Sequence, residues 1–365
     1  MPADIVVAGH IALDILPDMS TLTPEQIIGA GKVYEIGRIA YSTGGAVSNT
    51  GLALHRLGLG VALQAVVGDD WIGRAIIDYV RGFDERLGEH IRILPDSASP
   101  YTVVIEPQNH DRTLLTHTGV YKDYGAHSIN YDLLAGCKLF HLGYPTLLPR
   151  LYAVDGAEFL RLLSEVKARG TAISIDMSLP PPDSPSGRVD WRALLRRCLP
   201  LIDIFVPSIE EIVYMLRRDD WHGWRERLLD ELTGDYLAAL ADELLAMGAG
   251  IAGFKLGERG LYLRAAADTQ RLAFLSDLGG SAQDWAGAQS WQPAFAVQVA
   301  GTTGAGDAAY AGLLAALLRG MNAADCARWA CAVAACNIEA ADATTGVRSW
   351  GETAARLQAG WATRA

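Results

Sequence analysis

From residue 138 onward, short apolar runs alternate with helical segments, and this alternation constrains the fold more than any other feature of the chain. Strands that alternate with helices form a mostly parallel sheet covered by helices on both faces. The sequence therefore predicts an α/β fold, a doubly wound sheet with its ligands at the carboxyl ends of the strands. The expected strands are residues 138–142, 172–175, 202–206, 250–254 and 294–299, with helices between them, for example 158–167 and 236–247.

The N-terminal part adds one buried strand and two exposed segments. Residues 5–9 form a continuous apolar run, as in a buried strand, and we expect this strand to continue through Ile15. Residues 17–43 contain a partly alternating stretch, and residues 101–116 have the pattern of a β-hairpin with turn residues at 107–111. These two segments predict a small, exposed antiparallel sheet beside the main one.

The composition fits a single domain that spans residues 1–365. Half of the residues are hydrophobic and a fifth are charged, as in ordinary soluble enzymes. A net charge of −11 argues against nucleic acid or an anionic membrane as the main partner. No apolar run is long and clean enough to span a bilayer. Two segments with tryptophans, 217–233 and 279–291, are expected to be surface loops inserted into the domain.

The cysteines and the N-terminus indicate a cytoplasmic protein. The cysteine count is odd and no CxxC pair occurs, so we interpret the thiols as buried small hydrophobes in a reducing compartment. The first residues lack the basic start of a signal peptide. The cysteines are Cys137, Cys198, Cys326, Cys331 and Cys336.

The stretch Gly301-Thr302-Thr303-Gly304-Ala305-Gly306-Asp307 is too rich in glycine for a helix and runs into a small, apolar helical segment. A glycine turn that opens a helix presents free N–H groups and the positive end of the helix dipole, which together bind an anion such as phosphate. A P-loop has Lys and then Ser or Thr after its last glycine, whereas Asp307 and Ala308 follow here. A carboxylate beside an anion is unfavourable unless it takes a proton, so we interpret Asp307 as a base. The alternative is a glycine-capped core helix with a solvated Asp.

A second glycine turn, Gly44-Gly45, opens another helix with Asn49 in its first turns. Asn49 either faces a ligand or takes part in helix capping. Asp14 stands alone among apolar neighbours, and either faces the surface or binds hydroxyl groups. The pair Asp69-Asp70 precedes a further helix, and we interpret these acids as N-caps rather than metal ligands.

These residues resemble the signatures of the ribokinase-like carbohydrate kinases, the PfkB family, and the resemblance runs from Ile5 to about Trp350. It implies a ribokinase-like fold in which the small sheet is a lid over the substrate, and many members of the family form homodimers through this lid. It also implies transfer of the γ-phosphoryl group of ATP to a hydroxyl of a small sugar or a nucleoside. The residues that carry the resemblance are Gly44, Gly45, Asn49 and Gly304-Ala305-Gly306-Asp307, with Asp14 upstream and Gly257 and Gly260 in a turn between the two signatures.

The same resemblance implies a role for each matching residue. Asp307 would remove the proton of the attacking hydroxyl, and the turn Gly304-Ala305-Gly306 would form an anion hole whose N–H groups stabilise the transferred phosphoryl. Asp14, Gly44, Gly45 and Asn49 align with residues that hold the hydroxyls of the substrate. The nucleotide would be contacted by Lys255, Gly257, Gly260, Thr303 and Ser208.

The chain departs from the family pattern at three places. Gly301 stands where an Asp is usual that binds a monovalent cation in some members, so potassium activation is not expected. Ser208 replaces the Asn of an Asn-x-x-Glu motif, while Glu211 is retained and would hold Mg²⁺ through water. Lys255 stands where Thr is frequent, and it either neutralises phosphate charge or is a solvated lysine at the end of a strand.

Three functions follow from these residues, and an ATP-dependent kinase of a small sugar is the leading one. A nucleoside kinase of the same fold is the first alternative, and it needs an apolar or aromatic slot that Tyr34, Tyr41 or Tyr101 would supply. The second is a catalytically silent relative that binds a sugar or nucleotide. Retention of Asp307 argues against it, because a silent protein needs no base at an anion site.

Overall fold

A computed structural model describes residues 3–29, 31–108 and 113–364, and within them the main sheet has nine strands. Their order is β13-β12-β11-β10-β9-β8-β1-β4-β5. All neighbours are parallel except β12, which runs antiparallel to β11 and β13. The strands are β1 Ile5–Gly9, β4 Val61–Gly68, β5 Ile91–Leu94, β8 Leu139–Gly143, β9 Ala172–Asp176, β10 Ile204–Phe205, β11 Ile251–Lys255, β12 Leu261–Ala265 and β13 Gln289–Gln292.

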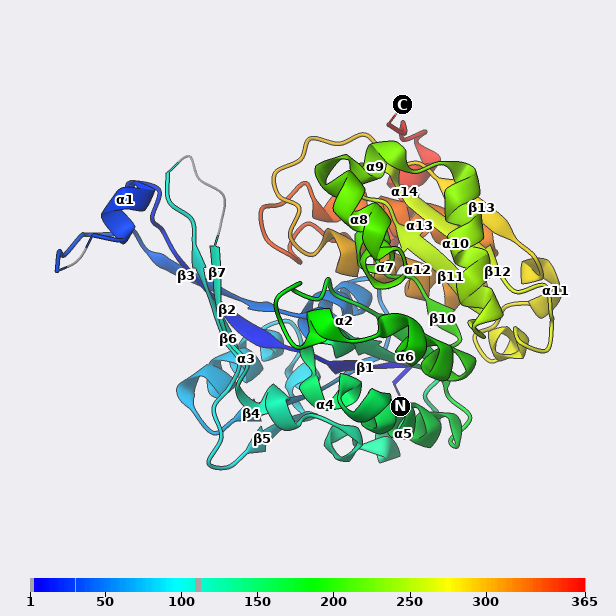
Figure 1. The fold of residues 1–365 in the computed structure, drawn as a ribbon, viewed down its shortest axis with the longest axis horizontal. Coiled ribbons are helices and arrows are strands. Elements are labelled where there is room, and N and C mark those ends of the chain that lie inside the picture. The colour runs from blue at the N-terminus through cyan, green and yellow to red at the C-terminus, as the bar shows by residue number, and fades with distance from the viewer. Residues whose placement is uncertain (1–2, 30, 109–112, 365) are drawn as a thin grey trace.

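Helices cover both faces of this sheet, as the alternating sequence predicts. One group contains α5 and α6, which contact each other beside β9, and α10, which contacts β11 and β12. The other contains α2, which contacts β1 and β4, and the neighbouring α12 and α13; Figure 1 shows α10 in front of the sheet and α12 and α13 behind it. The helices are α1 Pro24–Ile27, α2 Ala46–Arg56, α3 Trp71–Arg81, α4 Pro149–Tyr152, α5 Ala157–Lys167, α6 Trp191–Cys198, α7 Ile209–Leu216, α8 Arg218–Trp224, α9 Leu228–Glu231, α10 Gly234–Ala246, α11 Ala282–Trp285, α12 Ala305–Leu317, α13 Ala323–Asn337 and α14 Trp350–Gln358.

A second, four-stranded sheet projects from the body of the molecule, with α1 at its tip (Figure 1). Its order is β3-β2-β6-β7, from β2 Ala12–Pro17, β3 Ile39–Gly44, β6 Tyr101–Ile105 and β7 Thr113–His117. The predicted hairpin is present as β6 and β7, although residues 109–112 of its turn lie outside the described residues, as do residues 1–2 at the N-terminus. Within the segment 17–43, the strand occupies only the end, from Ile39.

The chain leaves the main sheet at Gly9, which corrects the expectation of one strand through Ile15. Gly9 has φ +120°, and a Cβ there would lie 2.3 Å from the carbonyl oxygen of Gly143 at the end of β8. Only glycine permits this turn and this close approach, so β1 ends and β2 begins in the small sheet. The strand order also reverses here, because β1 lies between β8 and β4, and such a switch point is where α/β sheets bind ligands.

Three further expectations about local structure were wrong. Residues 294–299 form no strand, only a bridge from Phe295 to Thr363. Segment 217–233 is mostly helical, and its Trp221 and Trp224 pack against tyrosines of the neighbouring helices α7 and α10. Segment 279–291 supplies α11 and most of β13 rather than a loop, because Trp285 is buried and its indole N–H donates to the carbonyl of Met321.

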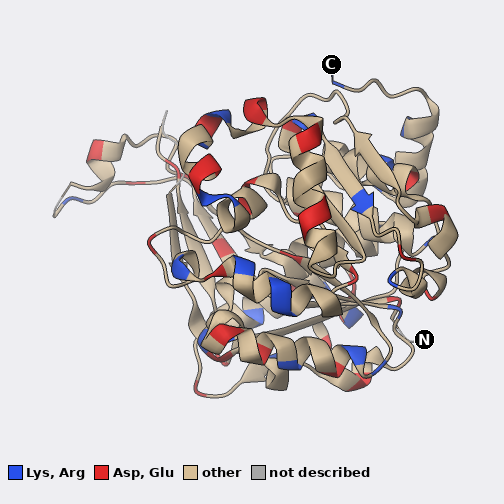
Figure 2. Cartoon of the chain, turned by 45° about the vertical axis from the view of Figure 1, so that its right-hand side comes forward, with Lys and Arg blue, Asp and Glu red and all other residues tan. Residues whose placement is uncertain are grey.

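Two further local predictions hold only in part: β2 and β6 are parallel, so the small sheet is mixed rather than antiparallel, and Asp69 pairs with Arg74 instead of capping a helix. The other local predictions agree with the structure. All five cysteines are buried and unpaired, and burial raises the pKa of the Cys198 thiol to about 12. Asp70 caps α3 by accepting from the N–H of Gly73 at 2.8 Å. None of the helices in the described residues is long and apolar enough to cross a membrane. Acidic and basic residues are both present on the helices that face the viewer in Figure 2.

Candidate active site

The glycine turn opens α12 as predicted. Gly304 is the N-cap residue at φ +70°, and a Cβ there would lie 2.7 Å from the carbonyl oxygen of Ala343, so the position requires glycine. The N–H of Ala305 donates to the carbonyl of Thr302 at 3.2 Å, which closes the turn. The N–H groups of Gly306 and Asp307 have no backbone acceptor among the described residues, and these two are therefore the donors left for an anion.

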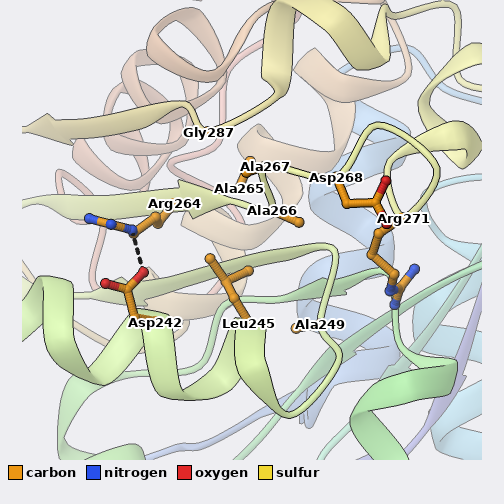
Figure 3. A pocket seen from close by; sticks show the side chains of 10 residues that line it. All are labelled: Asp242, Leu245, Ala249, Arg264, Ala265, Ala266, Ala267, Asp268, Arg271 and Gly287. Carbon is orange, nitrogen blue, oxygen red and sulfur yellow. Dashed lines mark ion pairs between the residues drawn. The ribbon is translucent and has the colours of Figure 1, made fainter.

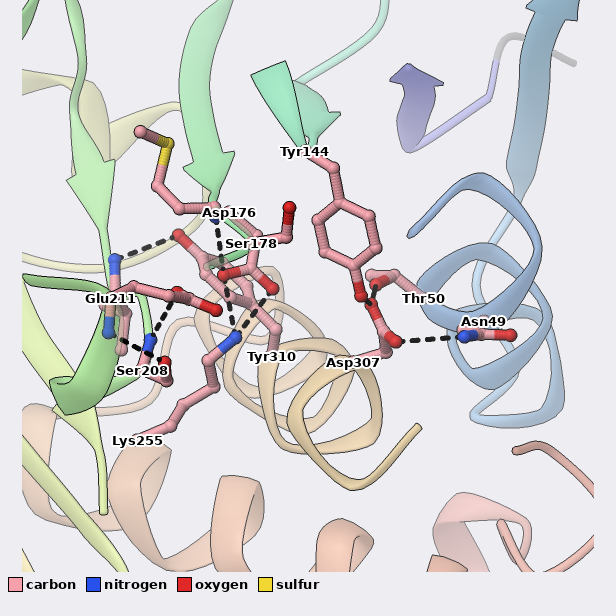
Figure 4. Close-up of polar contacts among 12 residues, drawn as sticks. Asn49, Thr50, Tyr144, Asp176, Ser178, Ser208, Glu211, Lys255, Asp307 and Tyr310 are labelled. Carbon is pink, nitrogen blue, oxygen red and sulfur yellow. Dashed lines mark hydrogen bonds and ion pairs between the residues drawn. The ribbon is translucent and has the colours of Figure 1, made fainter. Parts of the chain in front are cut away.

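The carboxylate of Asp307 is buried at the mouth of this turn and accepts three hydrogen bonds (Figure 4). Asn49 Nδ2 donates to Oδ2 at 3.0 Å, Thr50 Oγ1 donates to Oδ1 at 3.1 Å, and the Tyr144 hydroxyl donates to Oδ1 at 2.8 Å. The first two donors come from α2 and the third from the residue after β8, so two segments distant in sequence fix the orientation of this carboxylate. A solvated Asp on a capped helix would have none of these partners. The alternative interpretation, a glycine-capped core helix with a solvated Asp307, is therefore wrong.

The residues expected to hold the substrate lie on β2, at the end of β3 and at the start of α2. Asn49 is buried, and its Oδ1 has no hydrogen-bond partner within the described part of the chain. Gly45 is the N-cap of α2, and a Cβ there would lie 2.5 Å from Nδ1 of His10. Asp14 lies on β2 opposite β3, and a Cβ on Gly44 would lie 2.3 Å from its Oδ2. Because Gly44 and Gly45 have no Cβ, the side chains of Asp14 and His10 fit beside them.

His10 was not singled out from the sequence. It occupies the connection between the two sheets, and its Nδ1 is buried without a partner among the described residues. Burial lowers the pKa of His10 to about 4, so the imidazole is neutral at physiological pH. A neutral ring nitrogen and the carbonyl oxygen of Asn49 are both suited to hydrogen bonds with hydroxyl groups.

A cavity of about 600 Å³ lies on the other side of Asp307. Phe295, Val297 and Ile338 give it an apolar wall, which suits a flat heterocycle. Thr303 does not line this cavity; its carbonyl accepts a hydrogen bond from Asn337 Nδ2 at 3.0 Å. Residues expected on the nucleotide side that do line it are Ser208, Glu211, Lys255, Gly257 and Gly260, together with Gly304, Ala305, Gly306 and Asp307.

Lys255 is not a solvated lysine at the end of a strand, because it is a largely buried member of an ion pair. Its Nζ lies 2.7 Å from both carboxylate oxygens of Asp176 and 3.4 Å from where a Cβ on Gly306 would be (Figure 4). Burial opposes the charge on Lys255, but the carboxylates of Asp176 and Glu211 outweigh it and raise the pKa of the ammonium group. A fixed positive charge therefore stands behind the glycine turn.

Burial works against the negative charge on the two carboxyl groups of this cluster. Burial raises the pKa of Asp176 to about 6 and that of Glu211 to about 8, against the opposing effect of Lys255. Glu211 Oε2 accepts from the N–H of Ser208 at 2.8 Å, and Ser208 Oγ accepts from the N–H of Glu211. Ser208 thus caps α7, a role that needs no longer side chain.

The donor set fits magnesium held through water rather than directly. No group of three or more His, Cys, Asp or Glu side chains in the described residues is arranged to hold a metal ion. Glu211 and Asp176 are carboxylates near the cavity, and Mg²⁺ retains several waters when bound to phosphates. Position 301 offers no room for a side chain, since a Cβ on Gly301 would lie 2.7 Å from the carbonyl oxygen of Ala341.

The aromatic slot proposed for a nucleoside base is not formed by Tyr41 or Tyr101. Tyr41 pairs with Ile15, and Tyr101 pairs with Leu13, so both lie on the face of the lid opposite to Asp14. Tyr41 packs instead against Tyr79 of α3. Tyr34 lies outside the lid strands.

A separate groove of about 440 Å³ lies far along the sheet, between α10 and β12 (Figure 3). Its charged side chains already have partners: Arg264 pairs with Asp242 at 2.7 Å, and Arg271 pairs with Asp203 at 2.7 Å. None of the residues singled out from the sequence lines it.

Sequence reasoning missed Thr50 and Tyr144 as members of the site, and it missed the ion pair of Asp176. Thr50 follows Asn49 directly, and Tyr144 follows the predicted strand 138–142, so both stood at positions where ligands are expected. Asp176 ends β9, and its place after a strand was visible, but its pairing with Lys255 depends on which strands are neighbours.

A doubly wound sheet with a glycine turn at the start of α12, an adjacent buried carboxylate and a second, smaller sheet is the arrangement expected of a kinase that phosphorylates a sugar or a nucleoside. Family comparison agrees: the chain belongs to the pfkB family of carbohydrate kinases, whose model matches residues 3–350.

Individual proteins are similar to this chain in sequence or in fold. A nucleoside kinase of Methanothermobacter thermautotrophicus is 25% identical over 362 residues, which cover 98% of this chain and 96% of that protein. The ribokinase of Arabidopsis thaliana, solved with ribose and ATP, superposes with a TM-score of 0.71 at 17% identity, covering 98% of this chain and 99% of that one. A nucleoside kinase of Burkholderia thailandensis, solved with inosine, gives 0.65 at 20% identity, with 97% and 98% covered.

Proposed function

We propose that this protein transfers the γ-phosphoryl group of ATP to a hydroxyl of a small sugar, with Asp307 as the base. The observation that carries the proposal is the position of the Asp307 carboxylate. On one side of it lie two buried polar atoms without a hydrogen-bond partner among the described residues, His10 Nδ1 and Asn49 Oδ1, and on the other side lies the cavity of about 600 Å³. An acceptor on one side and a nucleotide on the other would both reach this carboxylate.

The transfer proceeds by attack of the acceptor oxygen on the γ-phosphorus while the bond to the bridging oxygen of ADP breaks. Asp307 takes the hydroxyl proton, and the N–H groups of Gly306 and Asp307 stabilise the charge on the equatorial oxygens. The ammonium group of Lys255 adds a fixed positive charge behind the turn. Mg²⁺, held through water near Glu211, neutralises phosphate charge when it is bound.

The lid supplies the acceptor pocket with hydroxyl-binding groups. Asp14 pairs with Ser42 on one side and with Thr102 on the other, and Thr102 pairs with Thr116, so four polar side chains form one row across the sheet. Closure of this face over the acceptor would exclude water, which otherwise competes for the phosphoryl group.

A nucleoside is the second candidate acceptor, and the same lid face favours it. Two residues farther out along each strand, the side chains become apolar: Leu16 pairs with Ala40, and Val104 pairs with Leu114. A polar row followed by an apolar row matches a ligand with hydroxyls at one end and a less polar ring at the other. The similarity to a nucleoside kinase over nearly the whole chain supports this candidate.

A coupled assay of ADP release with Mg·ATP, against matched panels of free sugars and their nucleosides, tests the proposal. Turnover with sugars supports the first candidate, and turnover with nucleosides alone supports the second. No turnover above the hydrolytic background, despite thermal stabilisation by ATP or a sugar, would overturn both and identify a silent binder.

A further inference from the structure

The hydrogen bonds to Asp307 divide its two carboxylate oxygens into different roles. A carboxylate has about four lone-pair positions, two on each oxygen. Thr50 and Tyr144 both donate to Oδ1, which fills its two positions. Asn49 alone donates to Oδ2, so one position on Oδ2 is left by the described residues.

Asn49, which donates to Oδ2 of Asp307, has an atom without a hydrogen-bond partner among the described residues. Asn49 is only 6% exposed, and its Oδ1 has no partner among the described residues while its Nδ2 is fixed on the carboxylate. Figure 4 shows this carbonyl oxygen on the side of the amide that faces away from Asp307. A substrate hydroxyl that donates to Oδ2 is therefore held by Asp307 itself.

The Tyr144 hydroxyl lies on the opposite side, where the nucleotide cavity begins. Tyr144 and Asp307 both line that cavity, and Figure 4 shows the ring of Tyr144 between Asp307 and the cluster of Lys255, Asp176 and Glu211. Thr50, by contrast, is fully buried in α2 and does not line the cavity. Of the two donors on Oδ1, Tyr144 is thus the one that stands between this oxygen and solvent entering with the nucleotide.

The backbone conformation of Tyr144 fixes the position from which its side chain reaches Asp307. The residue has φ 62° and ψ 50°, a left-handed conformation that is unusual for a tyrosine, and it precedes Pro145. Its N–H donates to the carbonyl of Asp176 at 3.0 Å. Burial and the neighbouring charge of Asp307 raise the pKa of its hydroxyl well above the usual range, so the group remains a proton donor.

We propose that Oδ2 of Asp307 is the oxygen that accepts the substrate proton, and that Tyr144 is a positioning residue that caps Oδ1 against water. The inference rests on the proposed kinase function. Without the cap, a water molecule from the nucleotide cavity can donate to Oδ1 and attack the γ-phosphorus. A bond then forms from the water oxygen to phosphorus, the bond to ADP breaks, and Oδ1 takes the proton, which releases inorganic phosphate.

The experiment compares wild type, Tyr144→Phe and Thr50→Val with Mg·ATP as the probe. Phosphate release is measured without acceptor, and transfer is measured with an acceptor from the panel. For Tyr144→Phe we expect acceptor-independent phosphate release to rise about tenfold relative to transfer, a part of the roughly 10²–10⁴-fold that a positioned base contributes. Thr50→Val vacates the same oxygen inside buried packing, so its ratio of hydrolysis to transfer should not rise.

An unchanged ratio in Tyr144→Phe, with its thermal midpoint near that of wild type, would overturn the capping role. The double variant Tyr144→Phe with Asp307→Asn gives a second check, because the excess hydrolysis should disappear with the base. Excess hydrolysis that survives there would equally overturn it. Failure of the kinase function itself is distinguishable, since it appears as absent transfer by the wild-type protein to every acceptor.

Discussion

The ammonium group of Lys255 lies 2.7 Å from each carboxylate oxygen of Asp176; the Asp176 side chain is fully buried and that of Lys255 is only 11% exposed. The two residues come from β11 and β9, which are separated in the sheet by the short strand β10. Because β10 consists of only Ile204–Phe205, the lysine can reach across it at the carboxyl edge of the sheet. Lys255 lines the cavity of about 600 Å³, and the ion pair holds its positive charge behind the glycine turn.

Removal of one partner of this pair should destabilise the protein strongly. Lys255→Met leaves the Asp176 carboxylate buried without its cation, a change that typically costs about 3–5 kcal/mol. The double variant Lys255→Met with Asp176→Asn should regain most of that stability, because neither charge remains. Chemical denaturation measures this, and a single variant as stable as wild type would contradict the buried ion pair. Transfer should stay impaired in the double variant, since the charge near the turn is still absent.

Stability should fall as pH rises through neutrality because of Glu211. Its pKa is raised from 4.5 to about 8 in the folded protein, so the folded state keeps a proton that the unfolded state has lost between these values. The resulting stabilisation is complete below about pH 4.5 and is lost as pH approaches 8. Thermal midpoints should therefore be lower at pH 8.5 than at pH 6. Glu211→Gln should flatten this difference, whereas Glu210→Gln, at an exposed neighbouring position, should retain it.

Asp307→Asn should abolish transfer while ATP still binds. The amide cannot take the hydroxyl proton, so kcat should fall by about 10²–10⁴-fold. Thermal stabilisation by Mg·ATP should remain, since the cavity and the turn are unchanged. Asp69→Asn, at a carboxylate more than half exposed, is the control and should behave as wild type. Retention of most activity by Asp307→Asn would show that another group is the base.

Potassium should have little effect on the rate. A monovalent cation beside the turn would need an acidic ligand at position 301, where Gly301 lies against the backbone of Ala340 and Ala341. Initial rates in matched potassium, sodium and choline chloride solutions should agree within about twofold, a difference of less than 0.5 kcal/mol in the barrier. A large, potassium-specific activation would show that backbone carbonyls alone form such a site.

The lid should mediate a homodimer, as its exposed apolar residues indicate. Ile39 and Leu115 are 60% and 55% exposed on one face of the lid, and Leu114 is 56% exposed on the other. Such apolar surface on a projecting sheet favours a second copy of the chain. Light scattering should give twice the mass of 39.1 kDa, and Ile39→Lys with Leu115→Lys should return the monomer. Ile93→Lys, at an exposed position on β5, should leave the dimer intact; a monomeric wild type would refute this assembly.

Much of the fold could be predicted because it follows from local pattern. The alternation of apolar runs and helices predicts the parallel sheet, and the glycine turns at Gly44-Gly45 and Gly301–Asp307 mark the starts of the helices that follow. Failures occurred where tertiary contacts decide. The break at Gly9 depends on the approach of Gly143, and Trp285 turns an apparent loop into part of the core.

The candidate site also combines residues that the local sequence indicates with residues that depend on tertiary contacts. Asp307 could be proposed as the base from the sequence alone, because an acid beside a glycine turn that opens a helix is chemically unusual. Tyr144 and Thr50 could not, because a tyrosine after a strand and a threonine in a helix are ordinary until the sheet order brings them to one carboxylate. The state of Lys255 likewise depends on Asp176, a residue 79 positions away in sequence.

The contact between Gly301 and the backbone of Ala341 makes position 301 epistatic with the segment after α13. A Cβ at Gly301 would meet that carbonyl oxygen at 2.7 Å, so an acidic side chain cannot be introduced there by one substitution. The segment would first have to retreat, and it also supports the turn through the hydrogen bond from the N–H of Ala300 to the carbonyl of Ile338. Engineering cation dependence into this enzyme therefore requires the two segments to be redesigned together, and either change made alone should be deleterious.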